Sequence, residues 1–392
     1  MTTMRRHPRS GALVGPVLLA LAGLLFLPAL PTAEVLPATA SAQGFPVATA
    51  PSHGPWDATV DSARSVVDLR MDLAGVPGLS IAVAVDGDVV WQEGFGFADL
   101  EHRLGVQPGT KFRIASISKA LTASAVCKLN EDGRLELDAP VQRYVPTFPE
   151  KTHPVTTRQL GGHLAGIRHY RGDEFMSREQ YDDVVDALVI FQEDSLLFVP
   201  GERYSYSTYG WNLVSAVVQG AAGEPFLTYM RENVIEPLGM DATVAEHVDS
   251  IIPDRAEFYV RGDDDRLLNA PYVNNSNKWA GGGYLSTARD MAVYGSAYLS
   301  GELLRPATVE LLWTSQETAA GEVTNYGIGW RTGERDGTRE VWHTGGAMGG
   351  STVLMIYPDA GVVVAVLTNV SGAPTTAIAR PVADLFIQAA GG

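Results

Sequence analysis

Two pairs of apolar, β-rich segments lie near opposite ends of this chain of 392 residues. Segments 79–85 and 89–93 are joined by an Asp-Gly-Asp turn, and such a turn between two β-rich runs is a strong short-range signal for a hairpin. Segments 353–357 and 362–368 are separated by Pro-Asp-Ala-Gly, which predicts a second hairpin. We therefore expect both ends of the chain to contribute strands to an antiparallel sheet.

Helical patterns surround and separate the two hairpins. The apolar residues of segment 57–73 recur at helical spacing and predict an amphipathic helix, and segment 376–389 predicts a second terminal helix. The intervening segment 135–299 carries helix-start signals, in which a hydroxyl and an acceptor three residues later satisfy free backbone donors. These capping-box pairs are Ser177 with Gln180 and Thr287 with Asp290.

This order of elements predicts an α+β fold, in which an antiparallel sheet is flanked by the terminal helices and a helical lobe is inserted in the sequence. We assign an α/β part to residues 56–134 and 300–392 and a mainly helical part to residues 135–299. Binding sites tend to form where two such parts meet.

The first 42 residues have the features of an export signal. Three arginines precede the apolar segment 11–30, and an Ala-Ser-Ala sequence before residue 43 fits a signal-peptidase site. We expect residues 1–42 to be removed, residues 43–55 to form a flexible tether and residues 56–392 to fold. The protein would then be periplasmic or secreted. The alternative is an uncleaved N-terminal membrane anchor, although two prolines interrupt the apolar segment.

Composition and residue spacing exclude several function classes. The formal net charge of −16 leaves no basic footprint for a phosphate backbone, so we expect no nucleic-acid partner. His163 and His169 lack the spacing and the glutamate of a zinc-binding helix, and we expect neither a metal nor a cofactor. The single cysteine, Cys127, lies in an apolar segment and is expected to be an inert core thiol.

Ser116 and Lys119 stand at the start of a segment, 120–127, that contains no charge and predicts a buried helix. Positions three apart share one face of a helix, so Lys119 can hydrogen-bond the Ser116 hydroxyl. Burial disfavours the ammonium form, and a neutral lysine can accept the serine proton. A bare Ser-x-x-Lys pair also occurs by chance, but the need to bury the lysine favours a catalytic interpretation.

Two further segments supply candidate groups. Tyr206 lies in a hydroxyl-rich segment and is a candidate for a second acid or base, although it works as a general base only if a cation such as Lys119 lowers its pKa. Aromatic core packing is the alternative. Small residues beside a predicted strand allow a substrate to approach and leave backbone amides free for an oxyanion hole. This second group is His343, Thr344, Gly345 and Gly346.

Taken in chain order, Ser116-x-x-Lys119, a triplet that begins at Tyr206 and the His-Thr-Gly sequence at His343 resemble the penicillin-binding and class C β-lactamase-related serine hydrolases. The resemblance covers about residues 58–389. Within the family, the chain is most similar to the branch that contains the mitochondrial serine β-lactamase-like protein, and this branch is regarded as peptidase-like. Further matching segments are 76–79, 110–116, 163–170, 279–283 and 326–330.

The resemblance implies a β-lactamase/transpeptidase-like fold and a role for each candidate. Ser116 would be the acylated nucleophile, Lys119 its proton acceptor and Tyr206 the acid or base for the leaving group. The backbone amides of Ser116 and Gly346 would form the oxyanion hole.

Two departures from the family pattern affect the expected substrate. Thr208 stands in place of an asparagine whose amide would orient an amide substrate. His343 replaces a lysine, and a neutral imidazole leaves no fixed cation there for the carboxylate of a β-lactam or of D-Ala-D-Ala.

We therefore expect a serine hydrolase that cleaves peptide amide or ester bonds in a small peptide, ester or β-lactam-like substrate. One alternative is a β-lactamase or a D-Ala-D-Ala carboxypeptidase. An alternative from another class is a penicillin-binding sensor without turnover, or an assembly-forming scaffold. Contact with a membrane is expected only through an uncleaved signal segment, and the oligomeric state is left open.

Overall fold

The computed structural model describes residues 54–391. The predicted export signal over 1–42 and nearly all of the predicted tether over 43–55 lie outside these residues. The last two tether positions, Gly54 and Pro55, open a 3₁₀ turn that leads directly into the first helix. Within the described part of the chain, no helix combines the length and the apolar character needed to cross a bilayer.

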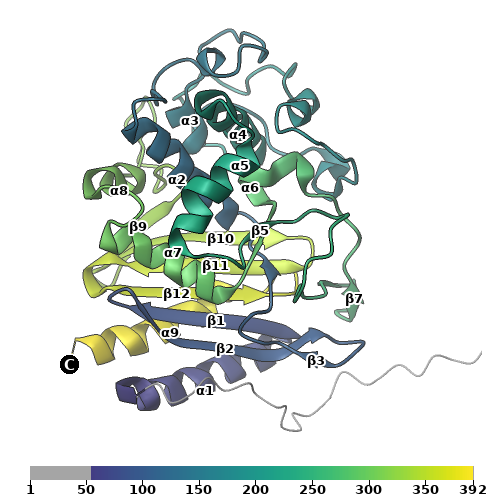
Figure 1. Ribbon diagram of the computed structural model, residues 1–392, viewed down its shortest axis with the longest axis vertical. Helices are drawn as coiled ribbons and strands as arrows, with labels where there is room; N and C mark the ends of the chain where they lie inside the picture. The colour runs from purple at the N-terminus through teal and green to yellow at the C-terminus, as the bar shows by residue number, and fades with distance from the viewer. Residues whose placement is uncertain (1–53, 392) are drawn as a thin grey trace, which may run out of the picture. The chain divides into compact units, whose positions relative to one another are not determined.

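A seven-stranded antiparallel sheet, built from both ends of the chain, lies at the centre of the fold (Figure 1). β1 pairs with β12, with Leu79 opposite Thr368 and Val85 opposite Val362, so the two predicted hairpins join side by side. Both hairpin predictions and the α+β class are confirmed. In spatial order the strands are β3 (Leu104–Gly105), β2 (Asp88–Asp99), β1 (Gly78–Val85), β12 (Val362–Thr368), β11 (Gly350–Tyr357), β10 (Thr338–Ala347) and β9 (Arg331–Arg335).

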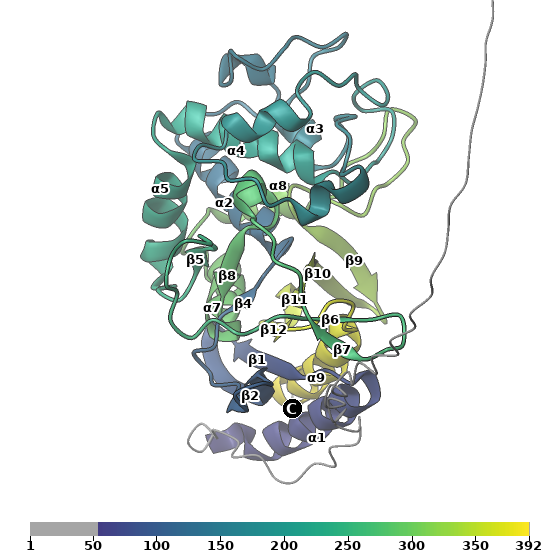
Figure 2. The same ribbon diagram turned by 90° about the vertical axis from the view of Figure 1, so that its right-hand side faces the viewer.

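Helices cover both faces of this sheet, because successive side chains of a strand point to opposite faces. Ile81 and Val83 belong to the core beneath α1 and α9, whereas Ala82 and Ala84 belong to the core on the side of α7. The two terminal helices lie together on one face, as predicted (Figures 1 and 2). The bounds of these helices are Asp57–Ala74 for α1, Ala288–Ser300 for α7 and Thr375–Ala390 for α9.

The remaining helices gather around α2, beyond the β10 side of the sheet (Figure 2). Every residue of α2 except Lys128, Asn130 and Glu131 is buried, which confirms the predicted buried helix. α2 packs against α4 and α6, whereas α7, which falls within segment 135–299, packs on the sheet. The bounds are Ile117–Glu131 for α2, Thr157–Gly161 for α3, Thr208–Ala222 for α4, Phe226–Met230 for α5, Trp279–Gly282 for α6 and Pro306–Trp313 for α8.

The two predicted helix starts have different outcomes. Thr287 caps α7 as expected, with its hydroxyl accepting the backbone N–H of Asp290 over 3.1 Å. The predicted start at Ser177 is wrong, because no helix begins there and the Ser177 hydroxyl accepts the backbone N–H of Glu179 over 3.3 Å. The Asn274 backbone N–H donates to the Ser177 carbonyl and its side-chain amide donates to Gln180 Oε1, each over 2.8 Å. A distant segment thus occupies the Gln180 acceptor, and a local turn bond occupies the Ser177 hydroxyl.

Candidate active site

Ser116 directly precedes α2, after a turn in an unusual backbone conformation. Ala115 has φ of +49°, in the left-handed region that residues with a Cβ rarely adopt and that functional sites often contain. The Ile114 carbonyl accepts a hydrogen bond from Thr352 Oγ1 of β11 over 3.0 Å, which ties the turn to the sheet. The turn thereby presents the Ser116 hydroxyl at the N-terminus of α2, where helix geometry favours developing negative charge.

The β10 strand approaches this turn closely at Gly345. A Cβ at Gly345 would lie 2.4 Å from the Ile114 carbonyl oxygen and 2.2 Å from Thr352 Oγ1. Gly345 is buried and does not line the cavity beside Ser116. Gly345 therefore has a packing role, because only a residue without a side chain lets the nucleophile turn sit against β10.

Lys119 is fully buried beneath Ser116. Its Nζ lies 3.0 Å from Ser116 Oγ and donates to the Gly281 carbonyl over 2.6 Å. Burial, together with the positive charge of Lys278, holds the pKa of Lys119 well below its ordinary value. A neutral amine that donates to Gly281 still has a lone pair with which to accept the Ser116 proton.

Tyr206 lies on the other side of the nucleophile, and its hydroxyl donates to Ser116 Oγ over 3.0 Å. Burial raises the pKa of Tyr206, and the hydrogen bond to Ser116 offsets this only in part. The condition for Tyr206 to act as a general base, a pKa lowered by Lys119, is not met, because burial raises the pKa of Tyr206 and also favours the uncharged amine of Lys119. Tyr206 therefore keeps its proton at neutral pH and can act as a hydrogen-bond donor and acid.

His163 and His169, whose spacing does not fit a zinc-binding helix, hold the segment that carries Tyr206. His163 Nδ1 accepts the backbone N–H of Ser207 over 3.1 Å, and His169 Nδ1 accepts that of Thr208 over 3.2 Å. Their rings lie 4.2 and 5.6 Å from the Tyr206 ring, between centroids. Accepting at Nδ1 requires a neutral imidazole, and burial lowers the pKa of both residues, that of His169 to about 4.

His343 of β10 is buried and uncharged, as expected. Its Nδ1 lies 2.7 Å from the Thr344 carbonyl oxygen, and its Nε2 lies 2.8 Å from the Tyr326 hydroxyl. Because a carbonyl can only accept, Nδ1 carries the proton and Nε2 accepts from Tyr326. Burial lowers the pKa of His343 to about 3.

A cavity of about 290 Å³ opens beside Ser116. The predicted site residues that line it are Ser116, Tyr206, Thr208, His343, Thr344 and Gly346. Lys278 and Arg331, which the sequence analysis did not single out, also line it, and its lining residues, all within 54–391, include no aspartate or glutamate. No fixed cation stands at the His343 position, but two other elements supply positive charge to the cavity.

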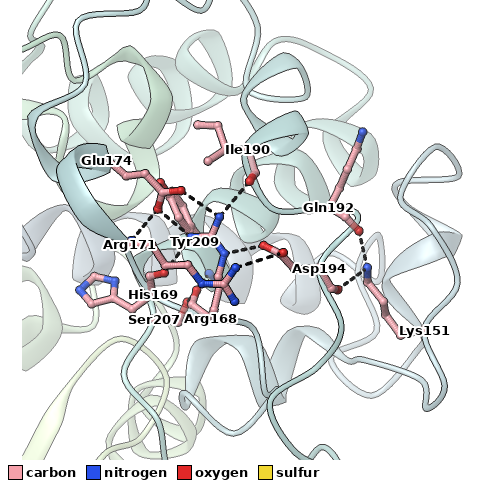
Figure 3. Close-up of polar contacts among 11 residues, drawn as sticks. Lys151, Arg168, His169, Arg171, Glu174, Ile190, Gln192, Asp194, Ser207 and Tyr209 are labelled. Carbon is pink, nitrogen blue, oxygen red and sulfur yellow. Dashed lines mark hydrogen bonds and ion pairs between the residues drawn. The ribbon is translucent and has the colours of Figure 1, made fainter.

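A buried ion network supports the wall of the site next to Tyr206 (Figure 3). The Arg168 guanidinium, 6% exposed, donates to the Glu174 carboxylate over 2.7 and 2.9 Å and also to Asp194. The Ser207 hydroxyl donates to the Arg168 carbonyl over 2.6 Å. The residue after Tyr206 is thus anchored through both its backbone and its side chain. No sequence periodicity connects these residues, and only the tertiary fold brings them together.

A serine at the head of a buried helix, hydrogen-bonded by a buried lysine and a tyrosine beside an antiparallel sheet, is the arrangement expected of the penicillin-binding and β-lactamase-related family. A comparison with protein families agrees, because the family model described as Beta-lactamase matches residues 63–389. The chain belongs to this family and has the β-lactamase/transpeptidase-like fold, which confirms the resemblance seen in the sequence.

Several known proteins are similar to this chain. It is 35% identical over 395 residues to the human mitochondrial serine beta-lactamase-like protein LACTB, covering 76% of this chain and 72% of that protein. It is 27% identical over 298 residues to penicillin-binding protein 4* of Bacillus subtilis, covering 71% and 65%. A solved structure, the octameric penicillin-binding protein homologue from Pyrococcus abyssi, matches with a TM-score of 0.73 at 29% identity, covering 84% of this chain and 77% of that chain.

Proposed function

We propose that this protein is an active serine hydrolase that forms an acyl-enzyme on Ser116 and cleaves peptide amide or ester bonds. The observation that carries the proposal is the position of Ser116 Oγ, 3.0 Å from Lys119 Nζ and 3.0 Å from Tyr206 Oη. Burying a lysine without an acidic partner destabilises a fold, and such residues are typical of functional sites.

The acylation step uses three proton transfers. The neutral amine of Lys119 accepts the Ser116 proton as Oγ bonds to the substrate carbonyl carbon. The backbone N–H groups of Ser116 and Gly346 are the proposed donors to the resulting oxyanion. Tyr206 gives its proton to the leaving nitrogen or oxygen as the bond to the acyl carbon breaks, and the proton held by Lys119 restores Tyr206.

Deacylation reverses these roles with water as the nucleophile. The pair of Lys119 and Tyr206 removes a proton from water, the new C–O bond forms, and the Ser116 oxygen leaves and is reprotonated. The products are the carboxylic acid and the free enzyme.

Turnover of β-lactams or of D-Ala-D-Ala peptides is a second candidate function. The presence of Arg331 in the cavity favours it, because both substrates carry a carboxylate. The side chain of Thr208, which lacks a carboxamide, and the neutral His343 argue against it, and we rank it below peptide or ester hydrolysis.

We also propose export, on the basis of residues 1–42, and sequencing the N-terminus of the mature protein would test it.

Intact mass after incubation with a fluorophosphonate probe tests the proposed function. We expect one adduct on the protein and none on its Ser116→Ala variant. A folded protein that gains no adduct would contradict an activated nucleophile and would favour a scaffold. An adduct that forms with a penicillin and does not decay would favour a sensor without turnover.

A further inference from the structure

Lys278 is a second buried lysine in the active-site cavity, and the proposed reaction does not use it. It lies directly before α6, lines the cavity and is 6% exposed. Its ammonium donates to the Phe175 carbonyl over 3.0 Å and lies 4.8 Å from the Phe175 ring centroid and 5.4 Å from that of Tyr170. An ammonium has three donors, so one carbonyl and two ring faces leave hydrogen-bonding capacity available for a ligand.

The carboxylates near Lys278 are already paired with arginines. Glu246 accepts from Arg113 Nε with both oxygens, each over 2.9 Å, and from the Asn275 side-chain amide over 2.7 Å. Glu174 accepts from Arg168. Over residues 54–391, no carboxylate forms an ion pair with Lys278. Burying a charge without a counterion costs free energy. This cost is recovered most fully when a ligand of opposite charge binds.

The charge of this subsite fits an acidic ligand. Burial and the charge of Arg113 lower the pKa of Lys278 to about 8, so the ammonium form still predominates at pH 7. The other cation of the cavity, Arg331, is only partly buried and lies over a different ring, 5.7 Å from the Tyr326 centroid. An ion pair is stronger where less water surrounds it. We therefore expect the more deeply buried Lys278, and not Arg331, to discriminate between acidic and neutral ligands.

We propose that Lys278 binds a carboxylate of the substrate, so that the enzyme prefers acyl compounds with an acidic group near the scissile carbonyl. This inference rests on the proposed serine hydrolase function. A purely structural lysine, which only ties α6 to the Phe175 carbonyl, is the competing explanation. The two explanations differ because the structural role needs a donor, whereas substrate binding needs a positive charge.

Two isosteric esters provide the test, the p-nitrophenyl monoester of adipic acid and that of its monoamide. We expect wild type to prefer the acidic ester by roughly tenfold to a hundredfold in kcat/KM, as for a hydrogen bond to a charged group. Lys278→Gln keeps a donor for the Phe175 carbonyl and should bring the ratio close to one. Any effect of Lys278→Gln on the reactivity of Lys119 changes kcat/KM for both esters by the same factor, so it cancels in the ratio.

Lys151→Gln is the matched control. Lys151 also donates to backbone carbonyls, those of Gln192 and Asp194, but does not line the cavity. It should keep the wild-type ratio. Equal kcat/KM for the two esters in wild type, or an undiminished preference in Lys278→Gln, would overturn the proposal.

A binding experiment separates this inference from the proposed function. Calorimetric titration of the Ser116→Ala variant with adipate and with its monoamide requires no turnover. We expect adipate to bind more tightly, and the difference to disappear in the Ser116→Ala, Lys278→Gln double variant. Equal binding of both ligands contradicts the Lys278 subsite. Tighter binding of adipate, together with a wild-type protein that fluorophosphonate does not label, contradicts only the proposed hydrolase function.

Discussion

The His163 ring lies 4.2 Å from the Tyr206 ring, and its Nδ1 accepts the backbone N–H of the residue that follows Tyr206. His169 repeats this arrangement one residue further on. The two imidazoles therefore fix both the ring and the backbone of the proposed acid. Because they hold the reacting group and do not touch the reacting atoms, we regard them as positioning residues.

Replacing His169 tests this positioning role. His169→Ala removes the acceptor for the Thr208 N–H and should slow fluorophosphonate labelling by about tenfold, with a loss of roughly 1 kcal/mol in stability. His169→Asn offers an acceptor oxygen close to the place of Nδ1 and should restore most of the labelling rate. Equal impairment in both variants, measured together with their unfolding midpoints, would indicate that the ring only fills space.

The pH dependence of labelling should report on Lys119. Only the neutral amine accepts the serine proton, so the rate should rise with pH through the pKa of Lys119, which burial and Lys278 hold well below 10.5. Removing the positive charge in Lys278→Gln favours the ammonium form of Lys119 and moves this rise to higher pH. At pH values below the midpoint of this rise, the rate should fall on the order of threefold to tenfold. A profile that does not move would contradict the electrostatic coupling of the two lysines.

Lys119→Met should remove most of the activity and stabilise the fold. The loss of the general base is expected to cost about 10²- to 10⁴-fold in rate. The pKa of Lys119 is lower in the folded than in the unfolded protein, so between these two values the unfolded chain binds the extra proton and stability falls as pH is lowered. The variant, which cannot bind that proton, should therefore unfold at higher urea concentration than wild type near pH 7. Its advantage should shrink toward pH 10, and a constant difference would contradict a buried neutral lysine.

Two neighbouring glycines of β10 should respond differently to alanine. The added Cβ of Gly345→Ala meets Thr352 Oγ1 at 2.2 Å and should destabilise the protein by about 1–3 kcal/mol while displacing the nucleophile turn. At Gly346 no atom lies within 4 Å of the added Cβ, so Gly346→Ala should unfold at nearly the wild-type temperature. Similar melting temperatures for the two variants would show that the turn does not pack against β10 as described.

Local signals account for what the sequence predicts correctly. An Asp-Gly turn specifies a hairpin without help from the rest of the chain, and the three-residue spacing of Ser116 and Lys119 puts both on one helix face. The false helix start at Ser177 has an equally good local signal, but Asn274 occupies the Gln180 acceptor and the Ser177 hydroxyl bonds Glu179 instead. Local patterns therefore identify candidates, and tertiary contacts decide between them.

The charge pattern of the cavity is the part that the sequence does not reveal. Lys278 and Arg331 come from different elements, and neither lies in a recognisable motif with Ser116. The substitution of lysine by His343 suggests a site without a cation, whereas the fold brings positive charge from elsewhere. Burial raises the pKa of Tyr206 and lowers that of Lys119, so each residue favours its uncharged form, which the sequence alone does not show.

Formation and decay of an acyl-enzyme on Ser116 is the central claim. Rapid-quench intact mass during turnover of p-nitrophenyl acetate, followed by peptide mapping, measures it most directly. We predict a single acetyl group on the peptide that contains Ser116, its disappearance as substrate is exhausted, and no adduct on the Ser116→Ala variant. Hydrolysis at the same rate by Ser116→Ala, or an acetyl group on another residue alone, would contradict the proposed mechanism.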